Sequence, residues 1–203
     1  MKHKISILIF SLTFVFSISN PQRLLCSTEL KDIFNNLRKI KQWKVEFDEE
    51  VFEQKGIIQR KSGDIQFQAP LTFRISYKNS YIISDGNLLQ FVFPDKKKVY
   101  TKKLSDSVSE NLIIQILSGS DEIINFFEIN SRKKGVYELI PKENSIKNVS
   151  KIMIYTTEIG FPIDKVEIFS KEIGIRMKVK KVSYKNFNID IAIPDGFEEV
   201  KDF

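Results

Sequence analysis

The chain has 203 residues, of which 42% are hydrophobic and 12% aromatic, and its formal net charge is +6. This length suits one ordinary domain with a sizeable core, and the hydrophobic content excludes a disordered chain. The basic runs at 96–98, 132–134 and 178–181 alternate with acidic residues or stand beside turns, which favours a solvated surface over a nucleic-acid interface. A single cysteine excludes a disulfide within the chain.

The N-terminus has the pattern of a secretory signal. Its first four residues include two lysines, and residues 5–18 carry no charge and are almost wholly apolar or Ser/Thr. This run is shorter than the roughly 20 residues that span a bilayer as a helix, which favours cleavage over a permanent anchor. A small-x-small site ends at Ser19, and a poorer one lies at 26–27. We therefore expect a signal peptide over 1–19, with the cut as late as 27, and one mature domain over 28–203.

Two amphipathic helices are predicted in the mature chain. Residues 30–40 place leucine, isoleucine and phenylalanine at spacings of three and four, after a serine and a threonine that can cap the helix. Residues 107–110 form a capping box, the apolar residues of 112–117 share one face, and Gly119 ends this second helix. Residues 121–127 extend it as a further helical turn.

The rest of the chain alternates with the period of two that half-buried strands show. Asp85-Gly86 stands between two apolar runs and indicates a hairpin, because glycine supplies the positive φ of a tight turn. Short strands joined by hairpins, about ten in all, predict a mainly β fold with a few helices, in which a strongly curved antiparallel sheet forms an unclosed barrel. The expected strands include residues 43–47, 65–67, 73–77, 89–93, 137–140, 152–155, 166–169, 175–179 and 187–193.

The sequence contains no residue motif that indicates catalysis. The only histidine, His3, lies in the predicted signal, which excludes Ser-His-Asp and Cys-His arrangements and histidine metal sites from the mature chain. Neighbouring acids at 48–50 and 198–199 would point to opposite faces of a strand. No glycine-rich phosphate loop is present. We therefore expect no enzyme, no metal and no cofactor.

The apolar side chains are the remaining indication of function. The chain has 17 phenylalanines, and many of them stand at alternating strand positions. A curved sheet that does not close needs a cover for its concave face, and the two helices are available for it. Such an arrangement encloses either a filled core or an apolar ligand cavity. The pattern alone is compatible with both.

The order of these motifs resembles the LolA-type periplasmic carriers of outer-membrane lipoproteins, from about Leu30 to Val200. The sharpest stretches are GDIQFQAPLTFRISY at 63–77 and ISDGNLLQF at 83–91, which resemble the family's strand, proline, aromatic-Arg strand and Ser-Asp-Gly hairpin. YELIPK at 137–142 and IPDG at 193–196 also match family positions.

This resemblance implies an unclosed β-barrel with a helical lid, located in the periplasm. Its cavity would hold the acyl chains of lipoproteins, taken from an inner-membrane ABC exporter and delivered to an outer-membrane acceptor. We expect a monomer that binds no nucleic acid. Carried over by position, the lipid-binding residues would be Leu37, Trp43, Phe47, Phe73, Ile75, Leu112, Ile113 and Ile116.

The sequence also departs from the family. The family commonly has an arginine directly before the proline, where it holds the lid shut, and this chain has Ala69 there. Arg74 or Lys61 would have to substitute for that latch. The family also tends to place aromatic residues where this chain has Gln90 and Val92.

Two other functions are compatible with the same pattern. An outer-membrane lipoprotein acceptor shares the fold but carries a lipid itself, and only Cys26 is available for it. A lipid-attachment cysteine needs a small residue just before it and usually an aliphatic one three before, whereas Leu25 and Arg23 stand in those places. A non-enzymatic envelope protein that uses the curved sheet to bind a partner is the second alternative.

Overall fold

Twelve strands form one continuous curved sheet in the computed structural model, which describes residues 21–106, 108–142, 146 and 148–200. The predicted signal over 1–19 and the cap residue Ser107 lie outside the described residues. The strands are β1 (Gln42–Glu53), β2 (Gly56–Gln68), β3 (Thr72–Ser76), β4 (Tyr81–Ser84), β5 (Leu88–Phe93), β6 (Lys98–Lys103), β7 (Phe127–Lys133), β8 (Val136–Pro141), β9 (Lys151–Thr156), β10 (Ile163–Phe169), β11 (Gly174–Ser183) and β12 (Glu198–Val200).

The sheet does not close. Its order is β12-β6-β5-β4-β3-β2-β1-β11-β10-β9-β8-β7, so β12 and β7 form the two edges. All neighbours are antiparallel except β12, which pairs parallel with β6. The long β1 strand joins the two halves by pairing with β2 on one side and β11 on the other. The predicted unclosed antiparallel barrel is therefore confirmed.

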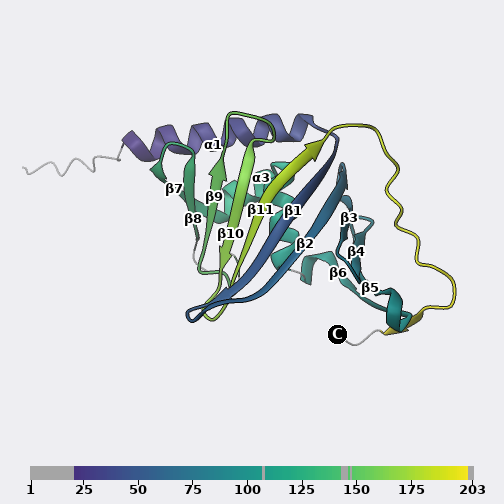
Figure 1. Cartoon of the computed structure of the whole chain (residues 1–203). Helices are drawn as coiled ribbons and strands as arrows, with labels where there is room; N and C mark the ends of the chain where they lie inside the picture. The colour runs from purple at the N-terminus through teal and green to yellow at the C-terminus, as the bar shows by residue number, and fades with distance from the viewer. Residues whose placement is uncertain (1–20, 107, 143–145, 147, 201–203) are drawn as a thin grey trace, which may run out of the picture.

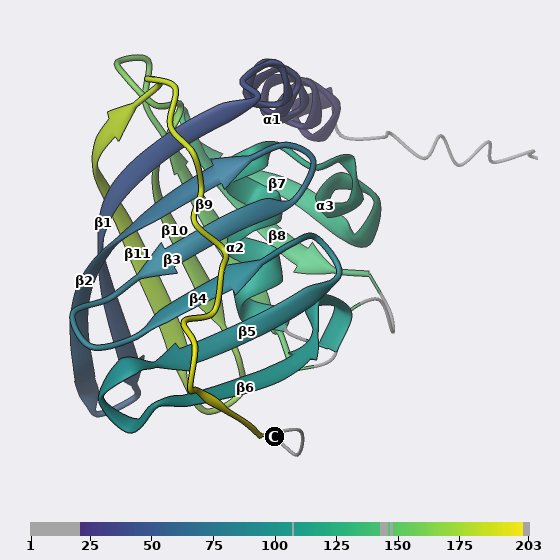
Figure 2. The same cartoon turned by 90° about the vertical axis from the view of Figure 1, so that its right-hand side faces the viewer.

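Three α-helices, α1 (Pro21–Lys39), α2 (Val108–Ser118) and α3 (Asp121–Phe126), cover the concave face. Figure 1 shows α1 along one end of the sheet, and Figure 2 shows α2 between the two halves of the curved sheet. Short 3-10 turns, η1 (Pro94–Lys96) and η2 (Leu104–Asp106), flank β6. In the part of the chain that the structure describes, no helix combines the length and apolar character needed to cross a membrane.

The outer face carries a second, smaller core. Ile83, Val92 and Val99 point outward from β4, β5 and β6, and the extended segment 184–197 covers them with Ile191 and other apolar residues. This segment runs across β3 to β6 in Figure 2. The Arg74 guanidinium fixes it by donating to the Asp190 carbonyl at 2.8 Å.

Several sequence expectations need correction. The first helix begins at Pro21 rather than after residues 27–28, because proline suits the first helical turn. β2 runs through Gly63 instead of beginning after it, and β6, β7 and β12 were missed. Residues 187–193 are extended but unpaired. Alternate side chains of this segment pack on the outer core. Such packing produces the alternating pattern without backbone hydrogen bonds to a neighbouring strand.

The junction between α2 and α3 packs directly on the backbone of α1, through Gly119. Its φ is +74°, and a Cβ there would lie 2.3 Å from the Phe34 carbonyl oxygen and 2.9 Å from Leu37 Cβ. Glycine therefore both ends α2, as predicted, and allows the close approach of the helices that cover the sheet.

We expect Gly119→Ala to lower the free energy of unfolding by about 2 to 4 kcal/mol, from the left-handed backbone and the steric clash together. Gly160→Ala is the matched control, because Gly160 has a φ of +81° but no atom within 4 Å of a built Cβ. It should cost about 1 kcal/mol, from the backbone alone. Urea unfolding of both variants measures the difference, and equal losses would show that the helix contact is not tight.

Candidate ligand-binding site

The eight residues predicted to bind lipid lie in one apolar cluster on the concave face. Leu37 comes from α1, two residues from β1, two from β3 and three from α2, and all are less than 9% exposed. Trp43 stacks on Phe67 with 5.0 Å between ring centroids. The structure therefore brings together side chains from four elements that are well separated in the sequence, although their contact with a ligand stays a prediction.

The concave face retains an open cavity of about 290 Å³, which we call the inner pocket. It lies at the end of the barrel where β1, β3 and β5 end. Of the eight predicted residues only Ile75 and Ile113 line it. Its other apolar and aromatic lining residues are Val51, Tyr77, Tyr81, Ile82, Phe91, Phe93 and Ile175, and its polar ones are Glu49, Lys61 and Ser80.

Sequence reasoning assigned several of these additional lining residues to strands but not to a site. Phe91 and Phe93 alternate on β5, and Tyr77 follows β3. Their alternation predicts that each lies on one face of the sheet. The pairing order that brings β5 and β1 around one pocket is a long-range property, which no local pattern contains.

A second hollow of about 640 Å³, the rim pocket, lies where the C-terminal end of α1 meets the α2–α3 junction and the β2–β3 turn. Ala69 lines it, together with Arg38, Asp121 and Glu122. The Ala69 N–H donates to the Lys41 carbonyl at 2.8 Å. This pocket is more polar than the inner pocket, because charged side chains of both signs surround its apolar floor.

Neither predicted substitute for the missing arginine lines the rim pocket. Arg74 points to the outer face, where it binds Asp190 and its guanidinium carbon lies 3.9 Å from the Tyr81 ring centroid. Lys61 lines the inner pocket. The basic residue beside Ala69 is instead Arg38, which forms an ion pair with Asp121 and so joins α1 to α3.

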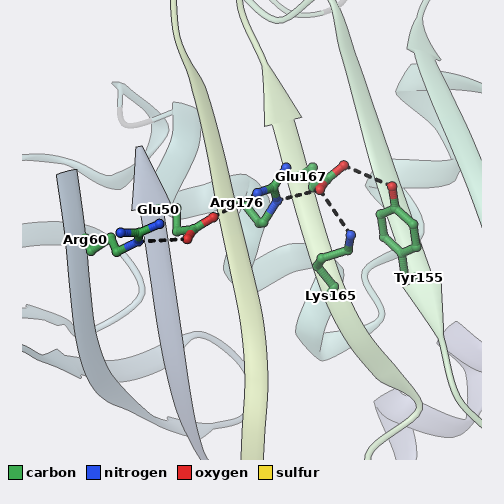
Figure 3. Close-up of polar contacts among 6 residues, drawn as sticks. All are labelled: Glu50, Arg60, Tyr155, Lys165, Glu167 and Arg176. Carbon is green, nitrogen blue, oxygen red and sulfur yellow. Dashed lines mark hydrogen bonds and ion pairs between the residues drawn. The ribbon is translucent and has the colours of Figure 1, made fainter. Parts of the chain in front are cut away.

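A buried carboxylate, Glu167, lies away from both pockets, on the outer face (Figure 3). It accepts hydrogen bonds from Arg176 at 2.6 Å, Tyr155 at 3.0 Å and Lys165 at 3.1 Å. Arg176 also binds Glu50 at 2.8 Å. These contacts tie β1, β9, β10 and β11 together, and they satisfy the carboxylate without a substrate cavity beside it, which indicates a structural role.

The environment of Glu167 changes its protonation. Burial raises the pKa of this carboxyl, but hydrogen bonds from Arg176, Lys165 and Tyr155 together outweigh burial and hold the pKa below its usual value of 4.5. Burial, followed by the hydrogen bond to Glu167, raises the pKa of the Tyr155 hydroxyl. A depressed carboxyl pKa stabilises the fold above the unfolded-state pKa, and this stability is lost as the pH falls through the folded-state pKa.

We expect Glu167→Gln to lower the free energy of unfolding by about 1 to 3 kcal/mol at pH 7, because Arg176 loses a buried ionic partner. The difference from the wild type should shrink as the pH falls below 4.5, where the wild-type carboxylate also becomes protonated. Glu158→Gln is the control, since its pair with Lys134 is more than 80% exposed on both sides and should be screened by solvent. Urea unfolding between pH 3 and 7 tests this, and a pH-independent loss at position 167 would contradict it.

Among the residues that the structure describes, no group of three or more His, Cys, Asp or Glu side chains could hold a metal ion. What the concave face offers chemically is an apolar surface that is covered by helices and partly hollow. Such a surface is suited to the burial of apolar groups.

Comparison with known proteins agrees with this geometry. The family model for the outer membrane lipoprotein carrier protein LolA matches residues 38–187, most of the chain. No curated protein sequence matches the chain significantly.

Solved structures with little sequence identity are similar to the chain. An uncharacterised conserved protein from Thermus thermophilus is 8% identical, with 87% of this chain and 99% of that chain covered and a TM-score of 0.52. The lipoprotein LppX from Mycobacterium tuberculosis is 12% identical, with 85% and 100% covered and a TM-score of 0.49. A putative outer membrane lipoprotein-sorting protein domain from Vibrio parahaemolyticus is 8% identical, with 77% and 92% covered and a TM-score of 0.42.

Proposed function

The chain belongs to the outer membrane lipoprotein carrier protein LolA family, and we propose that it is an exported, non-enzymatic carrier that binds acyl chains of lipoproteins on the concave face of its sheet. In this proposal the mature protein works in the periplasm. It takes acylated lipoproteins from an inner-membrane ABC exporter and passes them to the outer membrane, where an acceptor receives them.

The inner pocket is the observation that supports this proposal. Aliphatic and aromatic side chains form most of its wall, and one of them, Ile113, comes from α2. Its volume of about 290 Å³ is close to the lower limit of ordinary small-ligand pockets. Each methylene moved from water into such a site contributes about 0.8 kcal/mol, so burying two more of them strengthens binding by about tenfold.

A larger ligand requires α2 to move, and the contacts of α2 allow this. Of its described side chains at 111–118, none forms a hydrogen bond or ion pair with a strand; Gln115 binds Glu122 of α3 instead. Leu112 and Ile116 pack against the sheet by apolar contact alone. An acyl chain can replace such contacts with apolar contacts of its own, which is why we assign lipid binding to the eight residues of the concave cluster.

The position of Ala69 bears on how the helices are held. An arginine there could reach the acidic groups of the rim pocket, whereas alanine makes no charged hydrogen bond. The ion pair between Arg38 and Asp121 is partly exposed, with 37% and 59% of the side chains accessible, and such pairs contribute at most about 1 kcal/mol. We propose that apolar packing, rather than a charged latch, holds the helices over the sheet in this protein.

Blocking the inner pocket tests the proposal. Ser80→Trp places an indole at the lining, and excluding two methylenes costs about 1.6 kcal/mol, so the affinity for a fluorescent monoacylglycerol should fall at least about tenfold. Asn79→Trp is the matched control, because Asn79 is the exposed neighbour in the same turn and does not line the pocket. Its affinity should equal that of the wild type. Equal affinities for all three proteins, each folded by circular dichroism, would contradict acyl binding in this pocket.

A further inference from the structure

The β2 strand is paired along only part of one of its two edges. On one side β2 pairs with β1 along its whole length, from Gly56 to Gln68. On the other side β3 pairs only with residues 64–68 of β2. In the part of the chain that the structure describes, residues 57–62 have no strand beside them on this second side, and no backbone hydrogen bond reaches them from elsewhere. We call residues 57–62 the free edge.

The pairing between β2 and β3 stops because the chain turns back from β3 into β4. The Tyr77 N–H donates to the Ser80 carbonyl at 2.8 Å, which closes this turn. At the end of the pairing, a Cβ on Gly63 would lie 2.3 Å from the Ser76 carbonyl oxygen. Figure 1 shows the β1–β2 hairpin extending beyond this point, away from strands β3–β6. The free edge is therefore open along about 20 Å, at roughly 3.3 Å per residue.

Neighbouring strands hold the free edge in place. β1 pairs with β2 on one side and with β11 on the other, as far as Phe52. Arg60, within the free edge, donates to Glu50 at 3.1 Å, and Glu50 also accepts a hydrogen bond from Arg176 at 2.8 Å (Figure 3). A strand that is already formed can bind a further strand with little ordering of its own, which favours association.

The free edge offers both backbone groups and apolar side chains to a partner. Alternate residues of a strand direct their N–H and C=O groups to the same neighbour, so every second residue of this edge presents them to the open side. Ile57 and Ile58, near the hairpin tip, are 41% and 58% exposed. Arg60 and Lys61 follow along the same edge, and basic residues on an edge strand disfavour pairing with a second copy. The edge therefore suits an extended segment of a different polypeptide.

The free edge borders the inner pocket. Lys61 lines this pocket, and so does its cross-strand neighbour Glu49. Tyr77 and Ser80, from the turn beside the free edge, also line it. Ile57, at the other end of the edge, does not. A lipoprotein carries its acyl chains on its own polypeptide, so a chain whose lipid occupies the inner pocket must leave it beside this edge.

From this continuity we propose that the free edge binds the extended polypeptide next to the lipidated residue of a cargo lipoprotein, by adding it to the sheet as a further strand. The proposal rests on acyl binding in the inner pocket and adds recognition of the polypeptide to it. Main-chain hydrogen bonds supply the affinity in such an addition. Because all polypeptides share the same main chain, this site accepts lipoproteins of different sequence, while Ile57 and Ile58 favour apolar side chains at the far end.

Equilibrium titration of the full-length mature protein with matched ligands tests this role. The ligands are monopalmitoylglycerol, a hexapeptide with a palmitoyl chain on its N-terminal residue, and two forms of this lipopeptide that are N-methylated at its odd or at its even residues. We expect the lipopeptide to bind at least about tenfold more tightly than monopalmitoylglycerol, because roughly two or three main-chain hydrogen bonds are added. Only one N-methylated form should lose this gain, since only alternate residues face the neighbouring strand.

Hydrogen exchange of the backbone amides locates the contact. Bound lipopeptide should slow the exchange of alternate amides within residues 57–62 by at least about tenfold, because these amides gain hydrogen bonds. Monopalmitoylglycerol should leave them unchanged. The amides of β7, which forms a different edge of the sheet, are the internal control and should respond to neither ligand.

Three results would overturn the edge site and leave acyl binding intact: equal affinities for the lipopeptide and monopalmitoylglycerol, equal losses from both N-methylated forms, or unchanged exchange within residues 57–62. Failure of every ligand to bind would contradict acyl binding as well. Slow exchange at these residues in the ligand-free protein, together with a dimeric mass, would show that a second copy of the chain occupies the edge, which also contradicts the proposal.

Discussion

An open sheet of twelve strands leaves its apolar concave face uncovered, and keeping water from that face is the constraint on which this fold depends. Trp43 and Phe73 of the sheet are fully buried in one cluster with Ile116 of α2, which lies within the curve of the sheet. A sandwich would meet the same need with a second sheet. A helix covers the apolar face with a smaller surface than a second sheet, and it is held there less firmly. The described side chains of α2 at 111–118 form no hydrogen bond or ion pair with a strand, so this helix covers the core by apolar contact. In the proposed function, an acyl chain can replace that contact.

The two faces of the sheet consequently have different electrostatics. Outer-face charges pair across strands, as Glu167 does with Arg176 and Lys165, and these pairs connect strands that are distant in sequence. On the inner face, by contrast, Lys61 stands opposite Glu49 across the strands, and both residues line the inner pocket. The outer network thus links β1, β9, β10 and β11 of the curved sheet.

Local sequence patterns predicted much of this architecture. The alternation from Trp43 to Phe47 and the three- and four-residue spacing before Gly119 depend only on neighbouring residues, and both elements are present. The β6 strand was missed because its inward-facing Lys98 and Lys102 hide the apolar alternation. The unpaired segment 187–193 was taken for a strand because covering the outer core produces the same alternation. The pocket itself was not predictable, since it depends on which distant strands become neighbours.

The nature of the bound molecule distinguishes a carrier from a filled, ligand-free barrel. Native mass spectrometry of the protein purified gently from its own cell envelope would measure any molecule that occupies the concave face. A carrier of this kind should retain an acylated molecule, lost when the protein is denatured, and the Ser80→Trp variant should retain less of it. Repeated recovery of the wild-type protein at its unliganded mass, under conditions that preserve a lipid on a known acyl-binding protein, would contradict an acyl-binding function.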